Sequence, residues 1–124
     1  MTLPAEIANF FLAMQAGAAG EAQLTACFAE DAVYEEPFTG GGEMRRHEGR
    51  AAVIRAMSVG WEGPMALRDP VLRVDRVETS GDRIVLDWTC ASPSIPGGAG
   101  RGRNVYRMAG GRIAELVTTL EGGA

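Results

Sequence analysis

The sequence predicts an α+β domain in which a curved, mostly antiparallel sheet wraps over three helices in the N-terminal half of the chain. Apolar residues recur at spacings of three and four up to Trp61. From Ala66 onward they alternate with a period of two, as in strands. Turn signals at 80–82 and 109–111 divide that second part. A sheet curved over a long helix leaves a concave interior, where small ligands bind.

The predicted helices span residues 4–16, 21–28 and the stretch from Gly49 to Trp61. Gly17 and Gly20 separate the first two. Their apolar stripes hold Ile7, Phe10, Phe11 and Met14, then Leu24, Cys27 and Phe28, then Val53, Ile54, Met57 and Trp61.

The predicted strands alternate with polar or glycine-rich connections. A first strand covers residues 32–37, and a polar loop follows from Gly40 through His47. Four further strands are expected at 67–79, 83–92, 103–108 and 112–120, and residues 121–124 form a frayed tail.

Composition limits the class of protein. The 124 residues are enough for a single domain, 1–124, with its own core. A net charge of −4 gives no indication of the basic surface that nucleic-acid binding requires. There is no apolar run that could span a membrane and no signal-like N-terminus, so we expect a cytoplasmic protein. Cys27 and Cys90 are expected to be buried free thiols.

Two scarcities limit the chemistry. The chain has no lysine, which excludes a Schiff base and a phosphate-loop lysine. His47 is the only histidine, which excludes a site with two or three histidine ligands. We therefore expect no metal and no tightly held cofactor.

The first strand ends on Glu36-Pro37, where Tyr34 and Glu36 share one face. If that face is buried, a carboxylate lies among apolar residues. Burial of this kind is expected to raise a carboxyl pKa and to favour general acid–base chemistry. The alternative is an acidic strand end at the rim of the domain.

Several short segments, in this order and spacing, resemble the SnoaL-like, ketosteroid-isomerase-like group of the nuclear transport factor 2-like superfamily. They are Gln15-Ala16-Gly17, Phe28-Ala29-Glu30-Asp31-Ala32, Glu36-Pro37, Gly49-Arg50-Ala51-Ala52-Val53-Ile54 and Tyr106-Arg107-Met108-Ala109-Gly110-Gly111-Arg112-Ile113. The resemblance implies a cone-shaped sheet closed by helices over an apolar cavity, and a homodimer formed through the outer sheet face.

The resemblance also implies roles for individual residues. Glu36 stands at the position of the general base. Asn104 replaces an aspartic acid of the oxyanion hole. Phe10, with Phe11 as the alternative, stands where a tyrosine would donate its hydroxyl. Tyr34 or Tyr106 could supply a replacement hydroxyl, although each could equally be a core residue.

The predicted pocket for an apolar small molecule is lined by Phe10, Phe11, Met14, Phe38, Met57, Trp61, Trp88, Tyr106 and Met108. Trp61 and Trp88 are either ligand-stacking or core residues. His47 is expected to be structural or solvated rather than catalytic. Two functions remain open at this point. One is a cofactor-free isomerase or cyclase-type enzyme using Glu36, Asn104 and Tyr34 on an apolar cyclic or polyketide-like substrate. The other is a non-catalytic binding or dimeric scaffold module.

Overall fold

The computed structural model describes residues 3–59, 61 and 66–121 and has the α+β architecture that the sequence predicts. Its helices are α1 (Ala5–Ala16), α2 (Glu21–Cys27) and α3 (Arg50–Ser58), with short 3-10 turns η1 (Gly17–Gly20) and η2 (Pro96–Gly98). Its strands are β1 (Phe28–Glu36), β2 (Arg45–Glu48), β3 (Val71–Ser80), β4 (Arg83–Ala91), β5 (Ala99–Ala109) and β6 (Arg112–Leu120).

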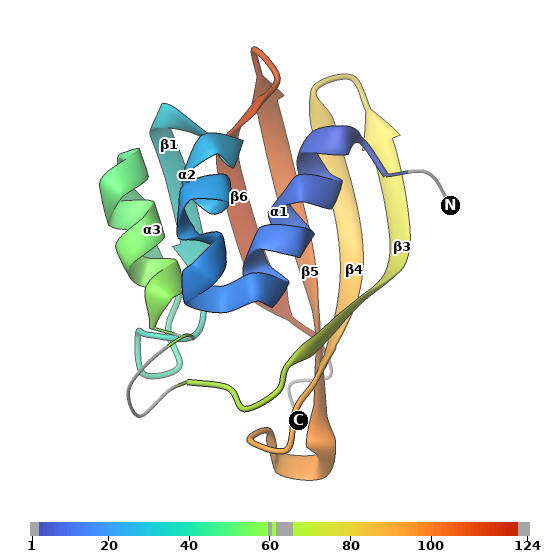
Figure 1. Ribbon diagram of the computed structural model, residues 1–124. Helices are drawn as coiled ribbons and strands as arrows, with labels where there is room; N and C mark the ends of the chain where they lie inside the picture. The colour runs from blue at the N-terminus through green and yellow to red at the C-terminus, as the bar shows by residue number, and fades with distance from the viewer. Residues whose placement is uncertain (1–2, 60, 62–65, 122–124) are drawn as a thin grey trace.

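The six strands form one curved sheet in the order β2-β1-β6-β5-β4-β3. All neighbouring pairs are antiparallel except β1 and β6, which are parallel. Figure 1 shows the helices gathered on one face of this sheet. The first and last strands of the chain thus lie side by side in the middle of the sheet.

Four element boundaries differ from the sequence prediction. β3 begins at Val71, four residues later than the predicted start at residue 67. Residues 45–48 form the edge strand β2 instead of a loop, and they carry no apolar pattern because an edge strand is largely exposed. β1 begins at Phe28, where the backbone leaves the helix for an extended conformation and meets β6 at Ile113. β5 begins at Ala99, because Gly100 and Gly102 pair with β4 despite their low strand propensity. The predicted helix end at Gly60 lies outside the described residues.

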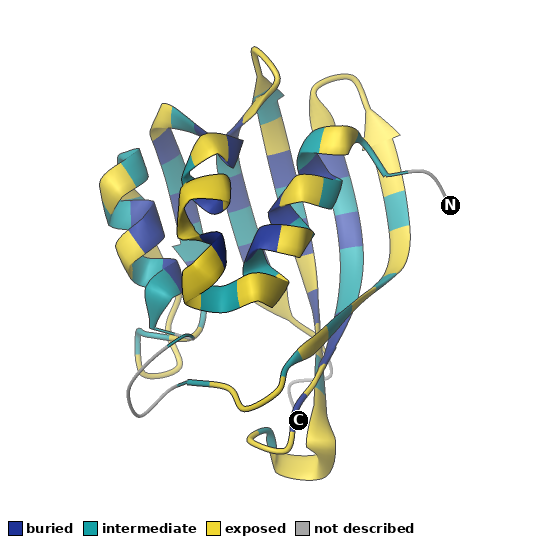
Figure 2. Ribbon diagram, viewed as in Figure 1, coloured by how far each residue is buried: buried dark blue, intermediate teal, exposed yellow. Residues whose placement is uncertain are grey.

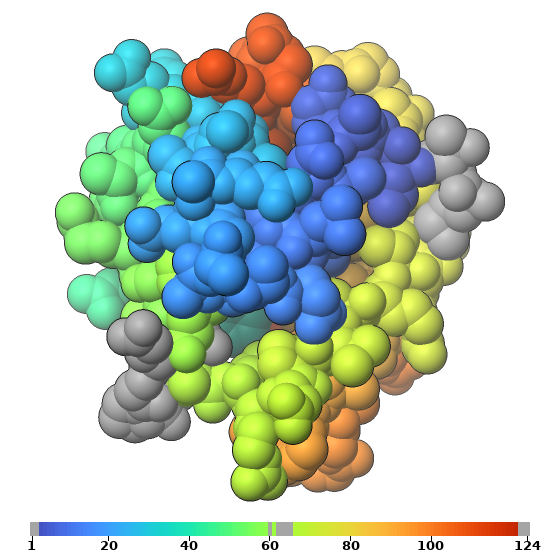
Figure 3. All heavy atoms as spheres, in the orientation of Figure 1, coloured from blue at the N-terminus to red at the C-terminus, as the bar shows by residue number. Residues whose placement is uncertain are grey.

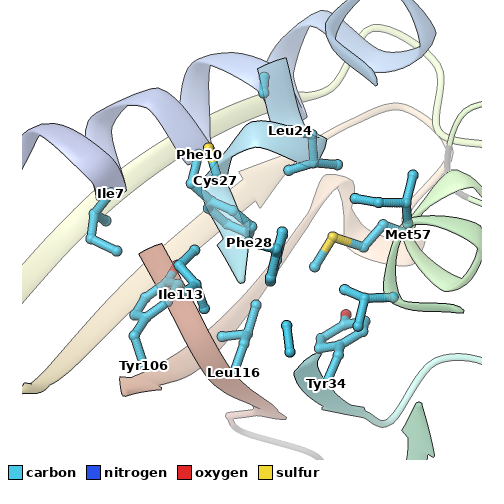
Figure 4. Close-up of a cluster of buried hydrophobic side chains, with 14 of the residues drawn as sticks. Ile7, Phe10, Leu24, Cys27, Phe28, Tyr34, Met57, Tyr106, Ile113 and Leu116 are labelled. Atoms are coloured by element: carbon cyan, nitrogen blue, oxygen red, sulfur yellow. The ribbon is translucent and has the colours of Figure 1, made fainter. Parts of the chain in front are cut away.

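The core fills the space between the helices and the concave face of the sheet. In Figure 2 the buried residues line the inner side of the helices and alternate along the central strands. Figure 4 shows Phe10 and Leu24 above Phe28, Tyr106 and Leu116. Tyr34 projects into the same cluster from β1.

The side chain of Gln15 joins α1 to the edge strand β3. Its amide nitrogen donates a hydrogen bond to the carbonyl oxygen of Pro70. Its amide oxygen accepts a hydrogen bond from the backbone N–H of Leu72 at 2.8 Å. Gln15 thereby satisfies backbone groups at the edge of the sheet, where no further strand of the described residues pairs.

Candidate functional site

The carboxylate of Glu36 is buried where β1 ends and the chain turns. Its side chain is 1% exposed. Pro37 interrupts the strand, and the next two backbone N–H groups point back at the carboxylate. Oε1 accepts a hydrogen bond from Phe38 N at 2.6 Å and one from Thr39 N at 2.9 Å, and the Thr39 hydroxyl donates to Oε2.

His47 reaches the same carboxylate from the neighbouring strand. Its Nε2 lies 2.8 Å from Glu36 Oε2. β1 and β2 pair so that His47 lies opposite Tyr34, and the two rings stack with centroids 6.0 Å apart at 30°. The imidazole is 18% exposed and the Glu36 side chain 1%, so solvent reaches the imidazole rather than the carboxylate.

Opposing effects act on the pKa of Glu36. Burial is the largest single influence and raises the pKa of this carboxyl. Hydrogen bonds from the Thr39 hydroxyl, from His47 and from the backbone of Thr39 and Phe38 together outweigh it, so the pKa lies below its ordinary value. The expectation that burial would raise the net pKa is therefore wrong, because four donors converge on the buried group. Glu36 is an anion at neutral pH.

Tyr34 is affected in the opposite direction. Burial, and next the negative charge of Glu36, raise the pKa of its hydroxyl, and a hydrogen bond with Thr118 only partly offsets them. The hydroxyl of Tyr34 therefore remains protonated at neutral pH.

A second cluster of buried polar groups lies beyond Tyr34, on β4, β5 and β6. Asn104 Oδ1 accepts hydrogen bonds from Trp88 Nε1 and from Thr118 Oγ1, both at 2.9 Å. Asn104 Nδ2 donates to the hydroxyl of Tyr106 at 2.7 Å. Burial raises the pKa of that hydroxyl, so Tyr106 is also a neutral donor.

The two clusters form one stripe across the concave face of the sheet, from β2 to β4. We call this stripe the polar belt. Its members are His47, Tyr34, Glu36, Thr118, Asn104, Tyr106 and Trp88. Polar groups buried in an apolar interior are costly unless they are paired, and here hydrogen bonds pair them.

The structure brings the three predicted catalytic residues, Glu36, Tyr34 and Asn104, into this belt. Of the predicted pocket residues, Phe10, Met57 and Tyr106 are buried, while Phe11, Met14, Trp61, Trp88 and Met108 pack partly buried against the core. Phe38 is 40% exposed. Whether these side chains line a ligand pocket stays a prediction.

Two belt residues, His47 and Thr118, are not among the predicted site residues. The sequence pattern places His47 in a polar loop, and its contact with Glu36 depends on β2, which has no apolar pattern to reveal it. The sequence nevertheless contains a clue to this contact. A buried carboxylate needs hydrogen-bond donors, and His47 follows Glu36 by only 11 residues. Thr118 alternates with Leu116 and Ala114 on the inner face of β6, so the period-two pattern places it inside.

The surface near the end of β1 combines a hollow with exposed apolar groups. Figure 3 shows a hollow between the C-terminal end of α1 and the segment 66–70. Figure 1 places that segment and the loop 37–44 at the same end of the molecule. Exposed apolar side chains in these two segments are Phe38, Met44 and Leu67.

Two surface grooves lie away from the belt. One of about 340 Å³ lies between α2 and α3 and includes Arg50 and Arg55 in its lining. The other, of about 270 Å³, lies on the outer face of the sheet at Asp87 and Arg103. Neither groove is lined by a belt residue.

Two further properties concern the described residues alone. They contain no group of three histidine, cysteine, aspartate or glutamate side chains placed to hold a metal ion. None of their helices has both the length and the apolar composition needed to cross a bilayer.

Comparisons with known proteins agree with this architecture. No curated protein matches the chain. Among solved structures, a candidate polyketide cyclase from Sinorhizobium meliloti superposes with a TM-score of 0.76 at 23% identity, covering 94% of this chain and 95% of that one. A candidate ketosteroid isomerase from Kribbella flavida superposes with a TM-score of 0.73 at 20% identity, covering 97% of this chain and 78% of that one. A nuclear transport factor 2-like protein of unknown function from Mesorhizobium loti superposes with a TM-score of 0.71 at 25% identity, covering 94% of this chain and 88% of that one.

These likenesses show the cone-shaped, nuclear transport factor 2-like fold that the sequence resemblance implied. The model of the SnoaL-like domain matches residues 7–116, which include every belt residue except Thr118. The chain belongs to the SnoaL-like domain family.

Proposed function

We propose that the protein binds an apolar, cyclic small molecule against the polar belt and catalyses cofactor-free proton transfer on it, as an isomerase or cyclase-type enzyme. The observation that carries the proposal is the buried carboxylate–imidazole pair, with 2.8 Å between Glu36 Oε2 and His47 Nε2. A buried, oriented acid–base pair inside an apolar interior is typical of a catalytic site.

The geometry favours His47 as the base, held by Glu36. An ionised carboxylate can only accept hydrogen bonds, so the imidazole nitrogen that faces it carries the proton. When the imidazole is neutral, Nδ1 carries the lone pair that can remove a proton from a substrate. Glu36, whose oxygens already accept four hydrogen bonds, fixes the tautomer and stabilises the imidazolium that forms.

This assignment changes the role that the sequence suggested for Glu36. The carboxylate could act as a base itself only by giving up a hydrogen bond from Phe38, Thr39 or His47. Its lowered pKa makes it a weaker base than an ordinary glutamate. In the proposal Glu36 orients the imidazole and supplies the negative charge that stabilises the imidazolium, and His47 exchanges the proton with the substrate.

The other half of the belt offers donors for the negative charge that develops when a proton is lost. Asn104 has an amide N–H, and Tyr34 and Tyr106 keep their hydroxyl protons because the pKa of each is raised. One preorganised donor of this kind is worth about 3 kcal/mol of transition-state stabilisation. Phe10 supplies no hydroxyl, so the belt would act with fewer donors than the resemblance implies.

The solved structures support this class of function without fixing the reaction. Two of the structural relatives are described as a candidate polyketide cyclase and a candidate ketosteroid isomerase. Acid–base chemistry on an apolar ring system suits the belt, whereas a highly charged anionic substrate would suit neither the apolar core nor the carboxylate beside it.

A non-catalytic binding module is the second candidate. It is favoured by one observation, namely that the hydrogen bonds of Glu36 and of the Asn104 oxygen are all made within the protein. Such saturation is also what a purely structural polar network would show.

The test is hydrogen–deuterium exchange at carbon, followed by NMR in D₂O. The protein is incubated with a panel of apolar cyclic ketones and lactones, and loss of the proton beside the carbonyl is measured. We expect His47→Gln to slow exchange of an accepted compound by about 10²–10⁴-fold. Glu36→Gln is expected to slow it as well, and Glu35→Gln, on the opposite face of β1, serves as the matched control.

The outcomes separate the two candidates. Exchange that depends on His47 supports the enzyme. Binding of a panel compound with no exchange above the rate of the buffer would leave the binding module as the better description.

We also propose that the protein forms a homodimer through the outer face of the sheet. That face carries the half-buried side chains Val85, Val105 and Val117, which lie on adjacent strands in register. Charges surround them, including the pair of Arg103 with Asp87 at 2.8 Å. An apolar centre with a charged rim is the usual composition of such an interface.

A further inference from the structure

The orientation of the Asn104 amide follows from its neighbours. Trp88 Nε1 lies 2.9 Å from Oδ1 of Asn104. An indole N–H can only donate, so the amide atom that faces it must be the oxygen. The Thr118 hydroxyl donates to the same oxygen at 2.9 Å. The nitrogen end of the amide is therefore turned away from Trp88, toward Tyr106.

The packing of Trp88 depends on a glycine on the adjacent strand. Gly102 pairs with Trp88 between β5 and β4. A Cβ added at Gly102 would lie 2.3 Å from Trp88 Cζ2, 2.7 Å from Cε2 and 2.8 Å from the carbonyl oxygen of Thr119. The indole thus lies directly on the backbone of Gly102, and no other residue type allows that position.

We propose that Trp88 and Thr118 are positioning residues that lock the Asn104 amide, so that its nitrogen faces away from Trp88 and one of its N–H groups can donate to a ligand. Among the described residues the amide nitrogen makes one hydrogen bond, to Tyr106, and an amide nitrogen has two N–H groups to donate. The accepting hydroxyl of Tyr106 keeps its own proton. The end of the belt at Asn104 and Tyr106 consequently presents hydrogen-bond donors.

The lock has a consequence for how a ligand is oriented, which rests on the proposed function of the belt and on the oxyanion-hole position that the resemblance implies for Asn104. A molecule held between His47 and Asn104 must place a hydrogen-bond acceptor, such as a ketone or lactone carbonyl oxygen, at the Asn104 end. A group that can only donate, such as an ammonium group, would find the Asn104 oxygen already occupied by Trp88 and Thr118.

The lock is tested first without any ligand, by NMR of the ¹⁵N-labelled protein. The Trp88 indole N–H signal is assigned by its loss in Trp88→Phe. We expect slow exchange of this proton with solvent in the wild type and in Thr118→Ser. We expect exchange at least tenfold faster in Asn104→Leu, which removes the acceptor. An indole proton that exchanges equally fast in the wild type and Asn104→Leu would overturn the lock.

The acceptor preference is tested with a matched pair of probes, 2-acetylnaphthalene and 2-isopropenylnaphthalene. They have nearly the same shape and differ in a carbonyl oxygen against a methylene group. We expect the wild type to bind the ketone about tenfold more tightly, which corresponds to one buried hydrogen bond. The preference should disappear in Asn104→Leu, fall in Thr118→Val and be retained in Thr118→Ser, which keeps the hydroxyl.

The outcomes distinguish the lock from the proposed function. Equal binding of the two probes by the wild type would overturn the acceptor preference. A full preference in Thr118→Val would remove the positioning role of Thr118. Binding of neither probe would contradict both the small-molecule site and its acceptor preference, while the exchange data would still decide whether the lock exists.

Discussion

Replacing Glu36 with glutamine tests the buried carboxylate with the smallest possible change in shape. The amide keeps one oxygen, which can still accept from the backbone N–H groups of Phe38 and Thr39. The other oxygen becomes an NH₂ group. That group faces the N–H of His47, so two donors meet where a donor and an acceptor met before.

The expected cost can be worked out from these bonds. Hydrogen bonds to a charged group contribute about 1.5–3 kcal/mol each, against about 0.5–1.5 kcal/mol for neutral ones, so the two backbone bonds together lose about 2 kcal/mol. The mismatch with His47 adds about 1 kcal/mol or more unless the imidazole changes its tautomer. We expect Glu36→Gln to lower the free energy of unfolding at neutral pH by about 3 kcal/mol.

The same carboxylate gives this loss a pH dependence of known sign. The pKa of Glu36 is lower in the folded protein than in the unfolded chain. Its stabilising contribution is therefore complete above the unfolded value of about 4.3 and is lost as the pH falls through the folded pKa. The difference in stability between the wild type and Glu36→Gln should accordingly shrink below about pH 4.5.

Urea denaturation followed by circular dichroism measures both effects. Glu35→Gln is the control, because Glu35 is partly exposed and meets Arg46 only at 3.5 Å, a surface pair that contributes little. Equal stability of Glu36→Gln and the wild type, or an equal loss in both variants, would refute the description of Glu36 as a buried acceptor of four hydrogen bonds.

Three further predictions test other parts of the molecule. Gly102→Ala should lower the free energy of unfolding by about 1–3 kcal/mol, because the new methyl group displaces Trp88, and urea denaturation would show a loss near zero if the strands simply move apart. Gln15→Ala should cost about 1–2 kcal/mol and speed amide exchange at Leu72; unchanged exchange there would mean that this hydrogen bond does not hold β3. Val117→Arg should convert a dimer to a monomer in sedimentation velocity without altering the circular dichroism spectrum, and a sedimentation coefficient equal to that of the wild type would exclude this face as the interface.

Much of the fold could be predicted from local patterns. The helix Ala5–Ala16 and the strand Arg112–Leu120 lie within one residue of their predicted bounds, because a stripe or an alternation of apolar residues reflects burial directly. β2 could not be predicted in this way. Its residues pair with β1 through the backbone, and its one inward contact, from His47 to Glu36, is made by polar atoms.

The candidate site was predictable only in part, for a related physical reason. Alternation on β1 placed Tyr34 and Glu36 on one face, and the structure shows that this face is buried. The sign of the Glu36 pKa shift depended on where the chain turns after Pro37 and on which donors return to the carboxylate. Those are three-dimensional facts that residue spacing does not contain.

The parallel pairing of β1 with β6 has a consequence for how the chain folds during its synthesis. Both neighbours of β1 are needed to enclose the carboxylate and its partners, yet one of them is the final strand, about 80 residues further along the chain. During synthesis, the edge of β1 that carries Tyr34 and Glu36 therefore stays unpaired on the β6 side until β6 has left the ribosome. Ribosome-stalled chains that end before Arg112 should accordingly resist proteolysis less than chains extended past Leu120, because the central sheet closes only with its last strand.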